Sequence, residues 1–118
     1  MDYETASTDA VDSVIPEEYG GMWFFRDPLG CEHLGVTLLE LEPGGKGKAH
    51  DHADEGHEEV YLVVDGELTV QLGGDGDAPP ETEVTLSDGD AVRVGPETRR
   101  QVHNHGDGTV RVVVAGAP

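Results

Sequence analysis

The chain has little cysteine and no long apolar run. Cys31 is the only cysteine among 118 residues, so the chain can form neither an internal disulfide nor a CxxC metal or redox motif. No segment approaches the roughly 20 apolar residues that span a bilayer, and the start of the chain lacks a basic leader followed by an apolar stretch. We therefore expect a soluble, cytoplasmic protein without a membrane partner.

Positive charge is also scarce. The chain has 25 acidic residues against 7 basic ones, for a formal net charge of -18 at pH 7. This field would repel a polyanion, so nucleic acid is not expected as a partner. The acidic residues are spread from Asp2 to Asp107. Such a composition is similar to that of proteins from salt-accumulating organisms, where salt screens the self-repulsion, and it predicts a halophilic protein.

The sequence shows no sustained helical period, whereas Leu68, Val70 and Leu72 alternate cleanly with polar residues. Short segments of this kind, bounded by Gly, Pro, Asp or Asn, predict strands. The predicted strands cover residues 22–26, 34–41, 58–64, 67–72, 83–86, 91–94, 101–104 and 109–114. The fold class is therefore all-β, and short strands at this spacing indicate a barrel or jelly roll.

The composition of the N-terminal residues and of two turn-like segments predicts how the chain is organised. Residues 1–15 are polar and acidic without a period, so they predict a loose, flexible N-terminal arm before one domain over residues 16–118. Asp65 and Gly66 lie between two strand-like runs and predict a tight hairpin turn. The Gly-rich and Asp-rich residues 73–80 predict a long flexible loop.

Potential metal ligands gather in one place. His50, His52, His57 and Glu59 lie within ten positions, directly before the apolar run at residues 60–64. Neutral imidazoles and a carboxylate together suit a divalent transition metal, and zinc, iron, nickel and manganese are all candidates. The sequence therefore places the functional site at this cluster.

The residues around this cluster resemble the first motif of the cupin superfamily. That motif is Gly, five residues, His-x-His, a short gap, Glu, six residues and Gly. Gly44, His50, His52, Glu59 and Gly66 fall at these positions. The gap between His52 and Glu59 holds six residues, where the family usually has three or four, so the loop that carries the ligands is slightly enlarged.

The second cupin motif can be laid on residues 89–104 without a gap, although only its ends match. Asn104 fits the last position, whereas Arg100 replaces the histidine that is normally the fourth metal ligand. This change removes a ligand and introduces a permanent cation. The resemblance covers residues 36–115 and implies a cupin-type jelly-roll β-barrel, often homodimeric, with a pocket for a small-molecule ligand at one mouth.

Successive side chains of a strand point to opposite faces, and this alternation predicts which candidate site residues face the interior. If Glu59 faces the interior, His57 and Tyr61 share that face, so His57 can take the place of the missing ligand. If Arg100 points inward, Asn104 does too, and the neighbouring histidines point outward. The expected metal ligands are His50, His52, His57 and Glu59, and the expected ligand-binding residues are Tyr61, Arg100 and Asn104.

The apolar run at residues 60–64 has no polar side, so we expect both of its faces to be covered. The barrel interior would cover one face, and another element or a second subunit the other. The segment with Trp23, Phe24 and Phe25 could supply that cover, in the same molecule or across a two-fold axis, and the simpler interpretation places these aromatic residues in the core.

The sequence leaves several functions open. In the first, a metal-dependent oxygenase or isomerase acts on a small organic acid that Arg100 binds. In the second, Arg100 pairs with Glu59, because a buried guanidinium needs a carboxylate partner. The pocket then binds or senses a small anion without metal or catalysis. In the third, a structural dimer with solvated histidines, His50 and His52 point apart.

Overall fold

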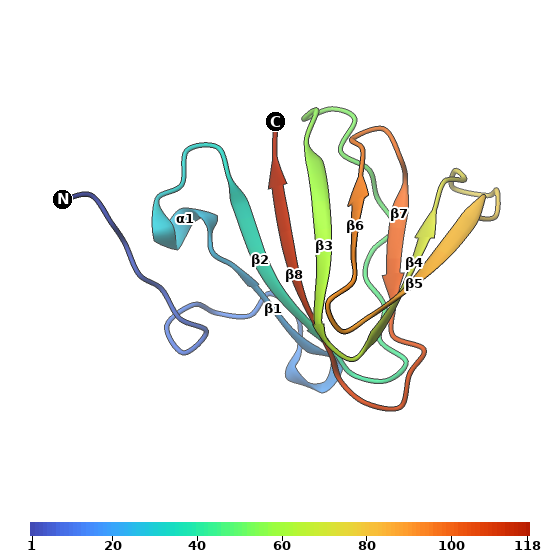
Figure 1. The fold of residues 1–118 in the computed structure, drawn as a ribbon, viewed down its shortest axis with the longest axis horizontal. Helices are drawn as coiled ribbons and strands as arrows, with labels where there is room; N and C mark the ends of the chain where they lie inside the picture. The colour runs from blue at the N-terminus through green and yellow to red at the C-terminus, as the bar shows by residue number, and fades with distance from the viewer.

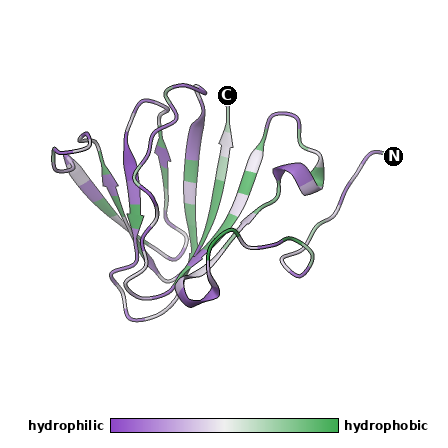
Figure 2. Cartoon of the chain, turned by 180° about the vertical axis from the view of Figure 1, so that it is seen from behind, coloured by the Kyte–Doolittle hydropathy of each residue, from purple (hydrophilic) through white to green (hydrophobic).

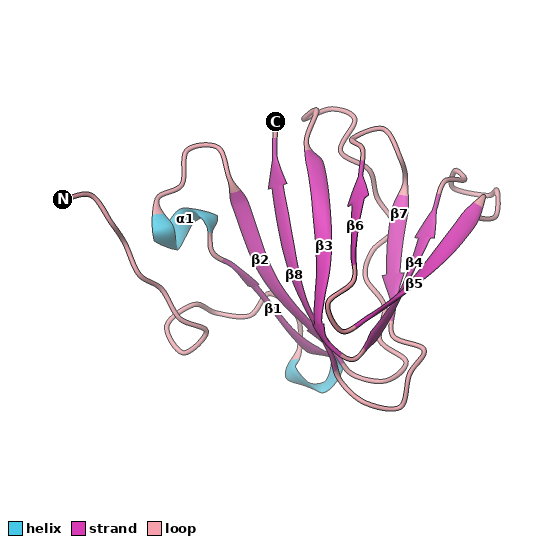
Figure 3. Ribbon diagram, viewed as in Figure 1, coloured by secondary structure: helices cyan, strands magenta, loops and turns pink.

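The computed structural model describes all 118 residues, and short strands make up most of its regular structure (Figure 1, Figure 3). Its two helices are short, η1 at Glu17–Tyr19 and α1 at Arg26–Leu29. Neither helix has the length or the apolar character needed to cross a membrane. The strands are β1 Gly20–Phe24, β2 Gly35–Leu41, β3 Glu58–Asp65, β4 Glu67–Leu72, β5 Thr82–Ser87, β6 Ala91–Val94, β7 Arg100–His103 and β8 Val110–Ala117.

These strands form two antiparallel sheets. The five-stranded sheet has the order β1-β2-β8-β3-β6, and the three-stranded sheet has the order β5-β4-β7. The sheets meet at the bottom of Figure 1 and diverge toward its top, with the C-terminus at the upper edge of the larger sheet. This is the predicted all-β jelly roll, and each predicted strand overlaps one observed strand.

The core lies between the two sheets, and alternation determines which residues enter it. Tyr61 and Val63 of β3 are buried, as are Leu68 and Val70 of β4. Apolar and polar stretches accordingly alternate along the strands in Figure 2. Aliphatic side chains from both sheets complete this single core, as expected for strands that each present one apolar face.

The outer face of β3 is only partly covered within this chain, and its cover by a second subunit stays a prediction. Val60, Leu62 and Val64 keep 37%, 38% and 50% of their surface exposed, so nothing in this chain covers them fully. The aromatic residues lie elsewhere than expected. Trp23 is only half-buried and Phe24 is 48% exposed, because both belong to β1 at the edge of the larger sheet.

The predicted hairpin at Asp65 and Gly66 is wrong, because the strands on either side of it belong to different sheets. The turn instead carries the chain across the core, which allows the apolar faces of β3 and β4 to meet. Gly66 has a φ of 98°, and a Cβ there would lie 3.0 Å from the carbonyl oxygen of Thr109. Glycine is required for both reasons.

The segment before η1 contains no helix or strand, but its last part contacts the larger sheet. The Val14 N–H donates to the Met22 carbonyl at 2.9 Å, and the Met22 N–H donates to Ser13 Oγ at 3.0 Å. This contact brings Ile15 to the edge of the interior cavity.

Candidate metal centre

The two histidines of the His-x-His pair lie beside the smaller sheet. Residues 46–50 run along β7, where the Gly47 N–H donates to the Val102 carbonyl at 2.9 Å. His50 and Arg100 exchange two backbone hydrogen bonds, of 3.0 and 2.8 Å. His52 is anchored in turn, because its N–H donates to the Pro96 carbonyl at 2.9 Å. Backbone pairing thus positions the loop that carries both rings.

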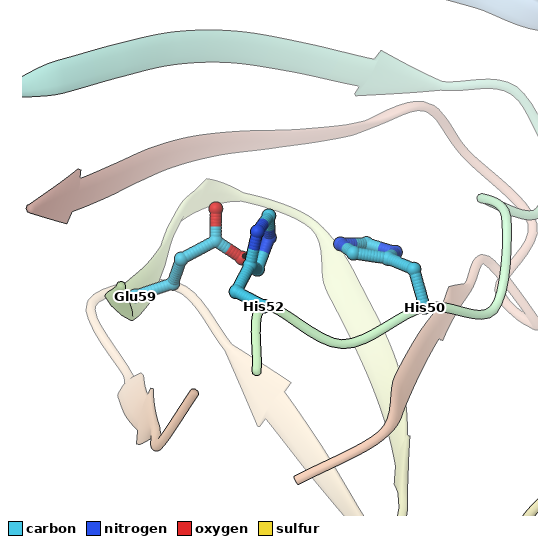
Figure 4. A group of neighbouring side chains, drawn as sticks. All are labelled: His50, His52 and Glu59. Atoms are coloured by element: carbon cyan, nitrogen blue, oxygen red, sulfur yellow. Dashed lines mark ion pairs between the residues drawn. The ribbon is translucent and has the colours of Figure 1, made fainter. Parts of the chain in front are cut away.

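Glu59 reaches the same point from β3, in the opposite sheet. One ligand atom each from His50, His52 and Glu59 can be chosen so that all lie within 4.8 Å of one another. Figure 4 shows the three side chains converging, with the His52 ring between the other two. The His50 and His52 ring centroids are 4.9 Å apart, in an edge-to-face arrangement. These histidines therefore do not point apart, as a purely structural dimer would require.

Hydrogen bonds orient both imidazoles in the way that metal ligands need. The Nδ1 atom of His50 lies 2.7 Å from the Lys48 carbonyl, and that of His52 lies 2.8 Å from a Glu55 carboxylate oxygen. Both partners only accept, so each Nδ1 donates, and Nε2 is the nitrogen that each ring has left for a metal. Such outer acceptors fix the tautomer of metal-binding histidines.

One contact distinguishes this cluster from an ordinary polar pocket. The Nε2 atom of His52 is buried and has no hydrogen-bond partner, yet it lies 3.2 Å from Glu59 Oε1. A buried polar atom without a partner is costly, and a cation bound by both Nε2 and the carboxylate would remove that cost. The donor set therefore fits a divalent metal, and the chemistry of two imidazoles and one carboxylate suits a transition metal.

Arg100 occupies the position of the missing ligand and is only 1% exposed. Its Nη1 donates to Glu59 Oε1 at 3.1 Å, its Nη2 to the Gly95 carbonyl at 2.6 Å, and its Nε to the Thr98 carbonyl at 3.0 Å. Every guanidinium nitrogen thus has a protein acceptor. Arg100 braces Glu59, and the geometry does not support its expected role as the group that grips a substrate anion.

Tyr61 also holds the carboxylate. Its hydroxyl donates to Glu59 Oε1 at 2.8 Å, and its ring lines the interior cavity. Burial, together with the Glu59 charge and this hydrogen bond, raises the pKa of Tyr61 well above its usual value. The phenol therefore stays protonated and continues to donate. Tyr61 and Arg100 both donate to Oε1, the carboxylate oxygen that also lies 3.2 Å from His52 Nε2, so they fix this oxygen beside the imidazole.

His57 lies apart from the group of three. Its ring centroid is 6.4 Å from that of His52, and it lines a separate depression of about 90 Å³ with Arg26 and Glu59. His57 directly precedes β3 and lines the same depression as Glu59, but the structure does not bring it into the candidate donor set.

Asn104 does not belong to the site, which corrects its expected ligand-binding role. It is 1% exposed, and its Nδ2 donates to the carbonyls of Leu41 and Gly108 at 2.8 and 2.9 Å. Its Oδ1 accepts from the Gly106 N–H at 2.9 Å. Its side-chain amide ties the turn between β7 and β8 to the end of β2, so its position in the motif reflects a structural role.

The other histidines lie outside the centre as well. His103 points away from the interior, where its Nε2 lies 3.1 Å from Gln71 Oε1. Burial, with the neighbouring charges of His105 and Lys46, lowers the pKa of His103. His33 and His105 are exposed.

A cavity of about 380 Å³ extends from the candidate metal centre into the fold. Eight of its sixteen lining residues are hydrophobic, and they come from both sheets and from Ile15. Sequence reasoning did not single out Lys46 and Lys48 as part of this lining, nor Glu55 as the partner of His52. The only signal for Glu55 is an acidic residue three positions after His52, inside the enlarged gap.

Comparison with known proteins agrees with this geometry. The family model described as "Cupin domain" matches residues 37–116, which is more than half of the chain. The chain belongs to the cupin family. No curated protein sequence matches the chain.

Several solved structures share the fold at low identity. A protein from Bacillus halodurans is 24% identical with a TM-score of 0.67, over 74% of this chain and 64% of that one. A cupin-superfamily sugar phosphate isomerase from Silicibacter pomeroyi is 23% identical with a TM-score of 0.73, over 97% and 75%. An oxalate decarboxylase from Lactobacillus farciminis is 17% identical with a TM-score of 0.73, over 91% and 31%. This cupin chain thus spans less than two thirds of two of these proteins.

Proposed function

We propose that this cupin holds one divalent transition metal at His50, His52 and Glu59 and binds a small organic anion beside it. The observation that carries the proposal is the buried, unpartnered Nε2 of His52, 3.2 Å from Glu59 Oε1. A cation bound by both atoms would give the buried nitrogen the partner that it lacks. The orientation of both rings by Nδ1 acceptors supports the same conclusion.

Three protein ligands leave several coordination positions open for a substrate. Two histidines and one carboxylate with open positions are typical of non-heme iron oxygenases. A bound metal would supply Lewis-acid activation of the ligand. The chain's own residues orient the donors. Arg100 and Tyr61 hold Glu59, Glu55 holds His52, and the apolar cavity wall limits the access of water. Oxygenase and isomerase chemistry are both compatible with this arrangement.

A second candidate is a ligand-binding or sensing cupin that works without metal. The direct contact between Arg100 and Glu59, at 3.1 Å, favours it, since this pair already neutralises the carboxylate. Under this alternative the site performs no catalysis, and the histidines bind the ligand by hydrogen bonds.

Cobalt substitution tests the first candidate against the second. Co²⁺ added to chelator-treated protein should give a visible absorption band in a stoichiometric titration. A small carboxylate such as acetate should then change that band, because open positions accept it. The His50→Ala variant is the matched control and should give no band. Absence of a band in the wild type would support the metal-free alternative, and a band insensitive to carboxylate would contradict the open positions.

We also propose that the protein is a homodimer formed through the outer face of its larger sheet. The strand register aligns outward-pointing apolar side chains in neighbouring rows across four strands. They are Trp23, Leu38, Val113 and Leu62 in one row and Val36, Ala115 and Val60 in the next. The outer face of the smaller sheet, by contrast, carries polar residues such as Gln71, Thr85 and His103.

Charge favours a second copy of the chain as the occupant of this face. Two chains of formal charge -18 repel each other over most of their surfaces. On the apolar face, however, Arg111 lies 3.8 Å from Glu40 and Arg93 lies 4.0 Å from Glu58. These ion pairs neutralise the charge around the apolar residues of the outer face, so two copies can approach through this face with the least repulsion. Each copy then buries the same apolar patch against the other.

A further inference from the structure

The interior cavity has an apolar wall that the candidate metal centre does not use. Met22 and Phe24 of β1 form one part of this wall, and Leu39 of β2 and Val114 of β8 continue it. A volume of about 380 Å³ lies within the usual range for small-molecule pockets. The wall has few groups that could hydrogen-bond the hydroxyls of a sugar or the second carboxylate of a diacid.

The charged residues of the cavity have a sign opposite to that of the molecule. Its lining contains Lys46, Lys48 and Arg100 against the single carboxylate of Glu59, a net charge of +2 with neutral histidines. These lysines are the only two in a chain of formal charge -18. Arg100 is occupied by protein acceptors, whereas both lysines are exposed residues of the lining. A positive concavity in an acidic protein concentrates anions.

We infer that the ligand of this cavity is an amphipathic organic anion with an acyl or aryl body and one carboxylate. Its apolar body packs against Met22, Phe24 and Leu39, and its charge is balanced by Lys46 and Lys48. This inference rests on the proposed function, because it names the substrate class of the same site. It separates this chain from an oxalate enzyme and a sugar phosphate isomerase, whose substrates are small or polar throughout.

Calorimetric titration with a homologous series tests the inference. The probes are straight-chain carboxylates from acetate to octanoate, with alcohols of equal length as charge controls and oxalate and glucose 6-phosphate as polar competitors. Each added methylene should tighten binding about fourfold until the cavity is full, since burial of a methylene contributes roughly 0.8 kcal/mol. Carboxylates should bind at least tenfold more tightly than alcohols of the same length.

Two variants test separately where the apolar body of the ligand and its carboxylate bind. Phe24→Ser should flatten the dependence on chain length, whereas Leu34→Ser changes an exposed apolar residue outside the cavity lining and should leave it unchanged. Lys48→Gln should weaken every carboxylate several-fold without affecting the alcohols. Arg93→Gln, which removes a cation from the outer face, should have neither effect.

Metal content measured on the same samples keeps this test separate from that of the proposed function. A flat series, or tighter binding of oxalate or glucose 6-phosphate than of octanoate, would overturn the inference even if the protein holds metal. A steep series in protein that takes up no metal would instead overturn the metal centre and leave the amphipathic ligand standing.

Discussion

At the scale of single residues, hydrogen bonds made away from the centre decide which atoms can bind a metal. Lys48 and Glu55 each accept from one Nδ1, and both rings thereby present Nε2 to the centre. Arg100 and Tyr61 fix the carboxylate through Oε1, the oxygen nearest to His52. The chemistry of the site thus depends on residues that would never contact the metal.

Removing the Glu55 carboxylate should weaken metal binding without unfolding the protein. Glu55→Ala frees the His52 ring to rotate and to change tautomer, and loss of such a partner typically costs about 10–100-fold in metal affinity. Competition with a chromophoric chelator measures this change. Asp54→Ala is the matched control, because Asp54 is an exposed neighbour of the same charge in the same loop. Equal affinities for the two variants would contradict the role given to Glu55.

Replacing Arg100 should destabilise the metal-free protein strongly. Arg100→Met leaves the half-buried Glu59 carboxylate without its cation and two carbonyls without a donor. Breaking a buried ion pair from one side costs about 3–5 kcal/mol. Saturating metal should restore part of the melting temperature, because the ion replaces the lost positive charge. A small loss, or no recovery with metal, would argue against the ion pair with Glu59 as the stabilising interaction.

At the scale of elements, alternation of apolar residues predicted the strands, whereas sheet membership could not be read from the sequence. Tyr61 and Val63 are buried as their spacing indicated, but the same spacing is compatible with a hairpin or with a crossing between sheets. The choice depends on contacts between distant strands. The cupin motif singled out His50, His52 and Glu59, because these residues lie close together in the sequence. The role of Asn104 could not be predicted in this way, because its side chain bonds the carbonyl of Leu41, which is distant in the sequence.

The crossing turn at Gly66 should be sensitive to a single methyl group. Gly66→Ala combines a strained φ of 98° with a Cβ only 3.0 Å from backbone atoms, so we expect a loss of about 2–4 kcal/mol. Gly89→Ala isolates the strain, because Gly89 has a φ of 84° with open space around it, and it should cost only about 1 kcal/mol. Denaturant unfolding measures both changes. Equal losses would show that the close approach at the turn carries no energetic weight.

At the scale of the whole molecule, negative charge dominates the surface. All acidic residues except Glu40, Glu42 and Glu59 are exposed, so their mutual repulsion acts mainly through solvent. Apolar side chains remain on one outer face, where the neutral ion pairs lie. This face is the one through which we propose that two copies associate.

Moderate salt should raise the melting temperature. The Debye length falls from about 10 Å at 0.1 M to about 3 Å at 1 M, so screening should remove most of the carboxylate repulsion in that range. Scanning calorimetry from 0.05 to 1 M KCl measures the effect. A melting temperature indifferent to salt would count against the proposed halophilic adaptation.

A charge placed on the outer apolar face should dissociate the proposed dimer. Leu62→Asp puts two like charges into the buried centre of a two-fold interface, so the variant should elute as a monomer in light-scattering chromatography while the wild type elutes as a dimer. Thr85→Asp, on the outer face of the smaller sheet, should leave the dimer intact. A monomeric wild type, or dissociation by both variants, would contradict this interface.

The most direct test of the account is the metal content of protein purified without a histidine tag and without chelator, at high salt. We predict about one divalent transition metal per wild-type chain and essentially none in the His52→Ala variant. A wild-type protein that contains no metal after exposure to zinc, iron, nickel and manganese, or a variant that retains the same content, would contradict the convergence of His50, His52 and Glu59 on one ion.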